Sequence, residues 1–146
     1  MKSILRFILA VIVGLLVGGI VNMALVLTGP HVFPPPAGVD MSDAKNLAAN
    51  IHLLTPRHFV FPFLAHAVGT LVGAMVGHLI ASTRRAGVAG VIGVFFLVGG
   101  ITAARMIPAP TWFIALDLIA AYLPMAWLGA RFGNCLRPQP MPVPPT

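Results

Sequence analysis

Four long apolar stretches, separated by polar breaks, run through almost the whole chain. They cover about residues 7–28, 62–82, 86–107 and 111–130. A bilayer core about 30 Å thick needs roughly 20 apolar helical residues, so each stretch is long enough to span it. None shows the strict alternation of half-buried or barrel strands. The pattern predicts an all-α membrane protein, a four-transmembrane-helix bundle that forms a single domain over residues 1–137.

The segment between the first two stretches, residues 29–61, is longer than the other connections. Three consecutive prolines, residues 34–36, give it a stiff, extended opening. Apolar residues then recur at helical spacing, with Asp40 as a plausible N-cap. We therefore expect a short amphipathic helix over about residues 41–54 on the outer surface. It would be either a packing cover for the bundle or a lid over an outer cavity.

The composition excludes most soluble classes of protein. Hydrophobic residues make up 58% of the chain and charged residues 8%, whereas soluble domains carry about 25% charged residues. Soluble enzymes, disordered proteins and coiled coils are therefore excluded. The single cysteine, Cys135, excludes an internal disulfide and multi-cysteine metal sites.

Basic residues predict the orientation of the bundle. With the N-terminus in the cytoplasm, most Lys and Arg side chains fall on the inner side: Lys2, Arg6, Arg84, Arg85, Arg131 and Arg137. Positive residues favour the cytoplasmic side, so both termini are predicted there. The Pro-rich tail, residues 138–146, would be disordered and cytoplasmic. The partner of these cations is predicted to be the headgroups of the lipid bilayer, with no nucleic acid bound.

Glycines at four-residue spacing mark the expected packing faces of the first two spans. They are Gly14 and Gly18 in the first span, and Gly69, Gly73 and Gly77 in the second. Small residues let helix backbones approach closely in lipid, where hydrophobicity does not drive association. The motif predicts either a close crossing of the two spans within one chain or a homo-oligomer, and it does not distinguish them.

Each span carries one polar or ionisable residue in its outer half. These residues are Asn22, His66, Arg105 and Asp117. Their expected depths below the outer interface lie between about 3 and 9 Å, so in a bundle they can meet. Additional candidates for this polar pocket are Thr102, Tyr122 and His58. Ionisable residues are costly inside a membrane and often functional, so this cluster is the candidate site.

Two interpretations of the cluster stay open. In the first, Arg105 and Asp117 form an ion pair and Asn22 and His66 hydrogen-bond between helices, which only locks the bundle. In the second, the cluster lines an outward-facing pocket that binds or transports a small polar solute, ion or proton. Under the first interpretation the chain is an accessory or structural subunit of a larger membrane protein complex. A third and more distant hypothesis is an intramembrane enzyme that uses a His66–Asp117 pair.

Other chemistry finds little support in the sequence. His31, His52, His58 and His66 match no standard ligand spacing, so no metal site is predicted. The chain has no glutamate, no G-x-S-x-G motif, and no phosphate-binding or dinucleotide fingerprint. We therefore assign no catalytic residue and no cofactor.

Two segments carry a family resemblance, residues 51–74 (IHLLTPRHFVFPFLAHAVGTLVGA) and the run from Ala109 to Gly129 that begins APTWFIALD. Both resemble an uncharacterised family of small bacterial four-span integral membrane proteins. The similarity covers most of the chain except the Pro-rich tail. It implies the four-span topology and a bacterial source, hence the inner membrane, but no activity.

Overall fold

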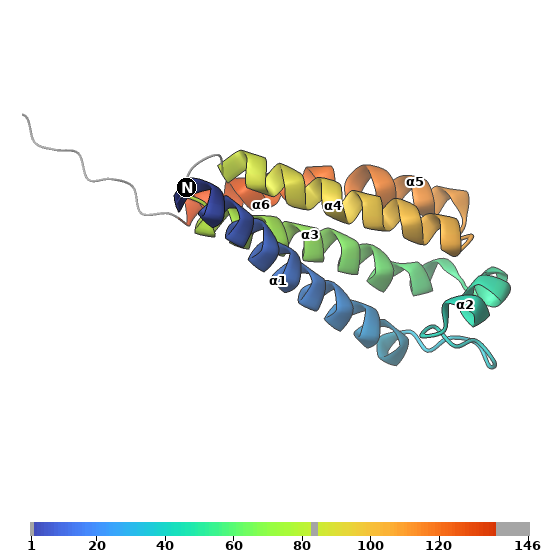
Figure 1. Cartoon of the computed structure of the whole chain (residues 1–146). Helices are drawn as coiled ribbons and strands as arrows, with labels where there is room; N and C mark the ends of the chain where they lie inside the picture. Colours follow the sequence, from blue (N-terminus) through green and yellow to red (C-terminus); the bar gives the residue numbers. More distant parts are fainter. Residues whose placement is uncertain (1, 83–84, 137–146) are drawn as a thin grey trace, which may run out of the picture.

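The computed structural model describes residues 2–82 and 85–136, and they form a bundle of helices (Figure 1). In chain order the elements are α1 (Lys2–Val32), α2 (Ala44–Asn50), the 3₁₀ helices η1 (Ile51–Leu53) and η2 (Pro56–Phe59), α3 (Val60–Ile80), α4 (Arg85–Met106), α5 (Thr111–Ala120) and α6 (Leu123–Cys135). Four helical stretches are long and apolar enough to cross a membrane: α1, η2 with α3, α4, and α5 with α6. The predicted all-α bundle with four candidate spans is confirmed. The predicted tail, residues 138–146, lies outside the described residues.

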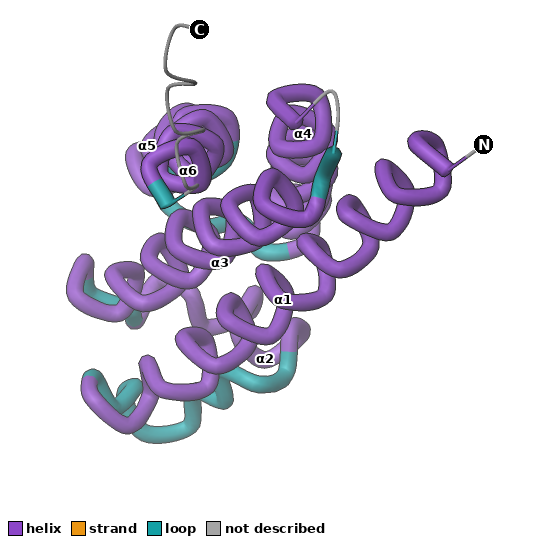
Figure 2. Tube along the Cα trace, turned by 90° about the vertical axis from the view of Figure 1, so that its left-hand side faces the viewer, coloured by secondary structure: helices purple, strands orange, loops and turns teal. Residues whose placement is uncertain are grey.

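Helix α3 is central and packs against α1 on one side and against α4 and α6 on the other (Figure 2). The α1–α3 crossing is built on glycine. A Cβ added to Gly14 would lie 2.7 Å from the carbonyl oxygen of Gly73, and one added to Gly18 would lie 2.6 Å from that of Gly69. The two backbones are in contact where the four-residue glycine spacing predicted a close approach. This contact lies within one chain.

Beyond this crossing, α1 diverges from the other helices (Figure 1). The connection between α1 and α3, residues 33–59, lies at that end of the bundle; we call it the cap and this end the cap end. The other end, where α1 begins and α6 ends, is the terminal end. There the Nε of Arg6 donates to the carbonyl oxygen of Ile80 at 3.1 Å, and His78 Nε2 lies 2.8 Å from Asn134 Oδ1. The helices are thus tied together at the terminal end and splayed at the cap end.

The cap contains less helix than the sequence predicted. Instead of one helix over residues 41–54, α2 is short and is followed directly by η1. Its N-cap is Asp43, which accepts from the Lys45 backbone N–H at 2.9 Å. Asp40, the predicted N-cap residue of this helix, instead accepts hydrogen bonds from the backbone N–H and the hydroxyl of Ser42 at 2.8 and 2.6 Å. Such a local side-chain turn competes with helix formation, so the helix begins later.

The fourth span is interrupted next to Pro124. Helix α5 ends at Ala120 and α6 begins at Leu123, with Pro124 in its first turn. Proline has no N–H to continue the hydrogen-bond ladder, and its ring crowds the preceding turn. The interruption gives Tyr122 a non-helical backbone, and its side chain is buried.

Candidate functional site

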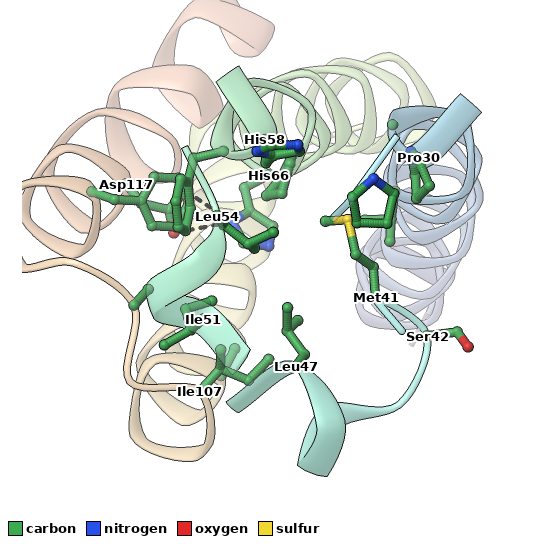
Figure 3. Close-up of a pocket in the computed structure, with 18 of the residues that line it drawn as sticks. Pro30, Met41, Ser42, Leu47, Ile51, Leu54, His58, His66, Ile107 and Asp117 are labelled. Atoms are coloured by element: carbon green, nitrogen blue, oxygen red, sulfur yellow. Dashed lines mark hydrogen bonds and ion pairs between the residues drawn. The ribbon is translucent and has the colours of Figure 1, made fainter. Parts of the chain in front are cut away.

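A cavity of about 570 Å³ fills the space that the diverging helices leave at the cap end. Its walls are the last turns of α1 and α4, the start of α3, helix α5 and the cap (Figure 3). Most of the side chains that line it are apolar, among them Leu27, Met41, Leu47, Ile51, Ile107 and Ile114. The cavity in the bundle is therefore largely apolar.

One buried polar cluster borders this cavity. His66 Nδ1 lies 2.8 and 3.0 Å from the two carboxylate oxygens of Asp117, and the Tyr122 hydroxyl donates to Asp117 Oδ2 at 2.7 Å. Asp117 is only 4% exposed. A carboxyl group in apolar surroundings needs hydrogen-bond partners, and here it has two. The predicted juxtaposition of His66 and Asp117 is observed, and Tyr122 completes it.

The local sequence explains how Tyr122 reaches Asp117. The break between α5 and α6 lets its side chain turn toward α4, where Gly100 lies. A Cβ on Gly100 would overlap the Tyr122 hydroxyl. The missing side chain on α4 therefore makes the room that the phenol occupies.

The His66 ring has one nitrogen left for a ligand. Asp117 engages Nδ1, and Nε2, on the far side of the ring, has no hydrogen-bond partner among the described residues. The side chain is 23% exposed and lines the cavity (Figure 3). Asp117 thus fixes the orientation of the ring, as carboxylates do for many functional histidines, and Nε2 is the accessible polar atom.

His58 also lines the cavity, but both of its ring nitrogens are engaged. Nδ1 lies 3.0 Å from the Thr55 backbone nitrogen and accepts its hydrogen. Nε2 therefore carries the ring hydrogen and donates to the Pro34 carbonyl oxygen at 3.2 Å. His58 ties η2 to the start of the cap, so we assign it a structural role.

The structure does not bring Asn22, Arg105 or Thr102 to the cluster, which corrects the expected convergence. Asn22 lies at the α1–α3 crossing, with its Cβ 2.9 Å from where a Cβ on Gly69 would stand. Arg105 is exposed, and no ion pair joins it to Asp117 in the described part of the chain. The Thr102 hydroxyl donates to Val98 of its own helix at 2.9 Å. Helix α4 turns these two side chains outward and directs small residues such as Gly100 inward.

No group of three or more His, Cys, Asp or Glu side chains that could hold a metal ion is found in residues 2–82 and 85–136. Ser42 is a hydroxyl-bearing residue in the cavity wall. Its Oγ donates to Asp40 at 2.6 Å, within the cap. The arrangement offers a ligand a mostly apolar volume and one oriented imidazole nitrogen, and the exposed side chains of His31, Asp40 and Ser42 also line the cavity.

Comparison with known proteins adds no relative: no protein-family model matches the chain, and neither a curated protein nor a solved structure shows significant similarity to it. The resemblance to small bacterial four-span proteins stays a prediction from the two sequence segments.

Proposed function

We propose that this chain is a membrane protein that binds a small molecule with an apolar body and one polar group in the cavity at the cap end. The observation that carries this proposal is the combination of a cavity of about 570 Å³ with mostly apolar walls and an imidazole nitrogen, His66 Nε2, in a ring that Asp117 orients. Binding sites for small molecules commonly pair apolar walls with a few placed polar groups. A bare ion needs several ligands gathered around it, and no group of three or more His, Cys, Asp or Glu side chains that could hold a metal ion is found among the described residues.

The orientation that we propose places the cap end outside and both termini in the cytoplasm of a bacterium, with the bundle in the inner membrane. It is supported by the distribution of basic residues, since Lys2, Arg6, Arg85 and Arg131 belong to the terminal end. In this orientation the cavity lies in the outer half of the bilayer.

The ligand would enter from the lipid. Leu27 on α1 lines the cavity and is also 60% exposed, so the cavity wall there is also an outer surface of the bundle. A molecule dissolved in the acyl chains could pass this edge without crossing the cap. Binding, with or without later transfer, is thus the activity that the geometry supports.

Titration of the protein in lipid nanodiscs with a long-chain methyl ketone tests this proposal. Labelled methyl groups of Ile51 and Leu54, which line the cavity, report on occupancy by NMR. We expect saturable shifts that are lost in Ala104→Phe, because Ala104 also lines the cavity. The matched control is Ala115→Phe, on the exposed face of α5 and outside the cavity. Non-saturable shifts, or equal loss in both variants, would refute the proposal.

A second candidate function, as a subunit of a larger membrane complex or homo-oligomer, rests on the outer face of α4. Gly90 and Gly99 have nothing within 4 Å of an added Cβ, and they line a shallow groove with exposed Val94 and Val98. Such a surface permits close approach of another helix. Native mass spectrometry in mild detergent, with Gly90→Leu and Gly99→Leu, tests it. Assembly that is lost in both variants would favour this function, and a monomer throughout would exclude the homo-oligomer.

A further inference from the structure

We propose that the terminal end of the bundle holds a discrete binding site for the phosphate of an anionic lipid headgroup, built by Arg6 of α1 and Arg85 of α4. This site is separate from the cavity at the cap end, and it does not depend on what that cavity binds. Its basis is the meeting of the two arginines at the end of α3.

Both guanidinium groups are anchored to the same end of α3. Arg6 Nε donates to the carbonyl oxygen of Ile80 at 3.1 Å. Arg85 Nε donates to the carbonyl oxygen of Ala81 at 3.3 Å. These acceptors belong to consecutive residues, whose Cα atoms lie about 3.8 Å apart. Figure 1 shows the start of α1, the end of α3 and the start of α4 together at this end. Two helices thus bring one cation each to adjacent carbonyl groups of a third.

Each arginine keeps most of its donors for another partner. A guanidinium has five N–H groups, and Nε is the nitrogen of each that bonds to the protein within the described residues. The Nη nitrogens have no hydrogen-bond or ion-pair partner in that part of the chain. Guanidinium N–H groups bind phosphate oxygens in pairs. Because Arg6 is exposed and Arg85 is half-buried, both groups are accessible from outside the bundle.

No acidic side chain lies near these cations. The acidic residues of the chain belong to the cap and to the cluster at the cavity; they are Asp40, Asp43 and Asp117. Lys2 adds a positive charge one helical turn from Arg6, on the same face of α1, where like charges repel. The carbonyl end of α3 carries only about half a negative charge. The region therefore keeps a net positive charge that an anion from outside the protein can neutralise.

The position of the site favours a lipid as the source of this anion. Arg6 lies near the start of α1 and Arg85 begins α4, and both helices are long and apolar enough to cross a membrane. The ends of such helices lie among headgroups, where basic pockets between helices bind anionic lipids. Exposed Ile8, Leu9 and Ile12 continue along α1 and offer apolar contact to acyl chains. Free phosphate would use the arginines alone.

Lipid retention in native mass spectrometry tests the site. The protein is released from phosphatidylcholine nanodiscs that contain a small fraction of phosphatidylglycerol with the same acyl chains, and the retained lipids are identified. We expect wild type to retain phosphatidylglycerol preferentially and saturably. In Arg6→Gln and in Arg85→Gln its apparent affinity should fall about tenfold, the effect of losing one charge-assisted hydrogen bond.

Arg131→Gln is the matched control. It removes the same charge from the same end of the bundle, but the Arg131 guanidinium lies over the Trp127 ring, 5.0 Å from its centroid. We expect this variant to retain phosphatidylglycerol as wild type does. Equal retention of the two lipids by wild type, or an equal loss of affinity in Arg131→Gln and Arg6→Gln, would overturn a discrete site.

Inorganic phosphate distinguishes the two sources of the anion. It is titrated into wild type in the mixed nanodiscs, and we expect it not to displace phosphatidylglycerol. Saturable displacement would show that free phosphate binds there and would overturn the lipid as the ligand.

NMR of the wild-type arginine side chains gives a readout that needs no folded variant. Phosphatidylglycerol should shift the guanidinium resonances of Arg6 and Arg85 relative to pure phosphatidylcholine, while those of Arg131 stay in place. Unshifted Arg6 and Arg85 resonances would contradict the site even if the variants retained less lipid.

Discussion

The Tyr122 hydroxyl donates a 2.7 Å hydrogen bond to the carboxylate of Asp117, five residues earlier in the same span. In a continuous helix this pair would lie about 140° apart, since five residues advance the helix by 500°. The break between α5 and α6 brings them together. The interruption of the fourth span is therefore part of how the candidate site is built.

Removing this phenolic hydroxyl should destabilise the bundle. In Tyr122→Phe the buried carboxyl of Asp117 keeps only His66, and we expect the free energy of unfolding to fall by about 1–3 kcal/mol. Reversible unfolding in mixed detergent measures it. Thr102→Val is the control, because the Thr102 hydroxyl bonds only to its own helix on an exposed face. A Tyr122→Phe protein as stable as wild type would show that the hydrogen bond does not contribute to the free energy of unfolding.

The α1–α3 crossing should be intolerant of a single methyl group. A Cβ at residue 73 would lie 2.7 Å from the Gly14 carbonyl oxygen, so Gly73→Ala must push the two backbones apart. Overpacking of this kind costs about 1–3 kcal/mol. Gly90→Ala, where an added Cβ meets nothing within 4 Å, should change stability little. If both substitutions had the same effect in detergent unfolding, the crossing would not be as described.

The cap should loosen when His58 is removed. His58→Leu deletes the acceptor for the Thr55 N–H and the donor to the Pro34 carbonyl oxygen. Because His58 is buried and makes both bonds, amide hydrogen exchange in the cap should accelerate by roughly tenfold or more, while exchange in α3 stays slow. His52→Leu, at an exposed cap position, serves as the control. Unchanged exchange in His58→Leu would remove His58 as the residue that holds the cap.

The turn at Asp40 should respond to acid. Hydrogen bonds from the Ser42 hydroxyl and then from its backbone N–H lower the pKa of Asp40 below the ordinary value. A depressed folded-state pKa means that the turn is stabilised above the unfolded pKa, and that this stabilisation is lost as the pH falls through the lowered value. The Ser42 amide resonance should therefore move in acid. Ser42→Ala should shift the Asp40 titration upward, and an unchanged titration midpoint would contradict the assigned cause.

Hydropathy and glycine spacing were sufficient to predict much of the fold. The four apolar stretches are helices. Gly14 and Gly73 lie in contact, as the four-residue glycine spacing of their helices indicated. His66 and Asp117 could be placed at one level because depth in a helix follows directly from residue number.

The rotation of each helix about its axis was not predictable in the same way. Helix α4 carries apolar and small residues around its whole circumference, so its sequence does not indicate whether Gly100 or Arg105 faces the bundle. Nor could the sequence show that the break at Pro124 would direct Tyr122 toward Asp117, because that depends on the space left by Gly100. The shape of the cap depends on competition between Asp40 and Asp43 as local hydrogen-bond acceptors.

Photolabelling in nanodiscs tests the binding cavity most directly. A photoreactive diazirine on a long-chain ketone should label Ala104, Ile107 and Ile114, and excess unlabelled ketone should suppress that labelling. Peptide mass spectrometry of wild type and Ala104→Phe reads the result, with loss of cavity labels expected in the variant. Labels confined to lipid-facing side chains such as Ile119 and Leu16, unaffected by competitor, would contradict a ligand-binding cavity in this bundle.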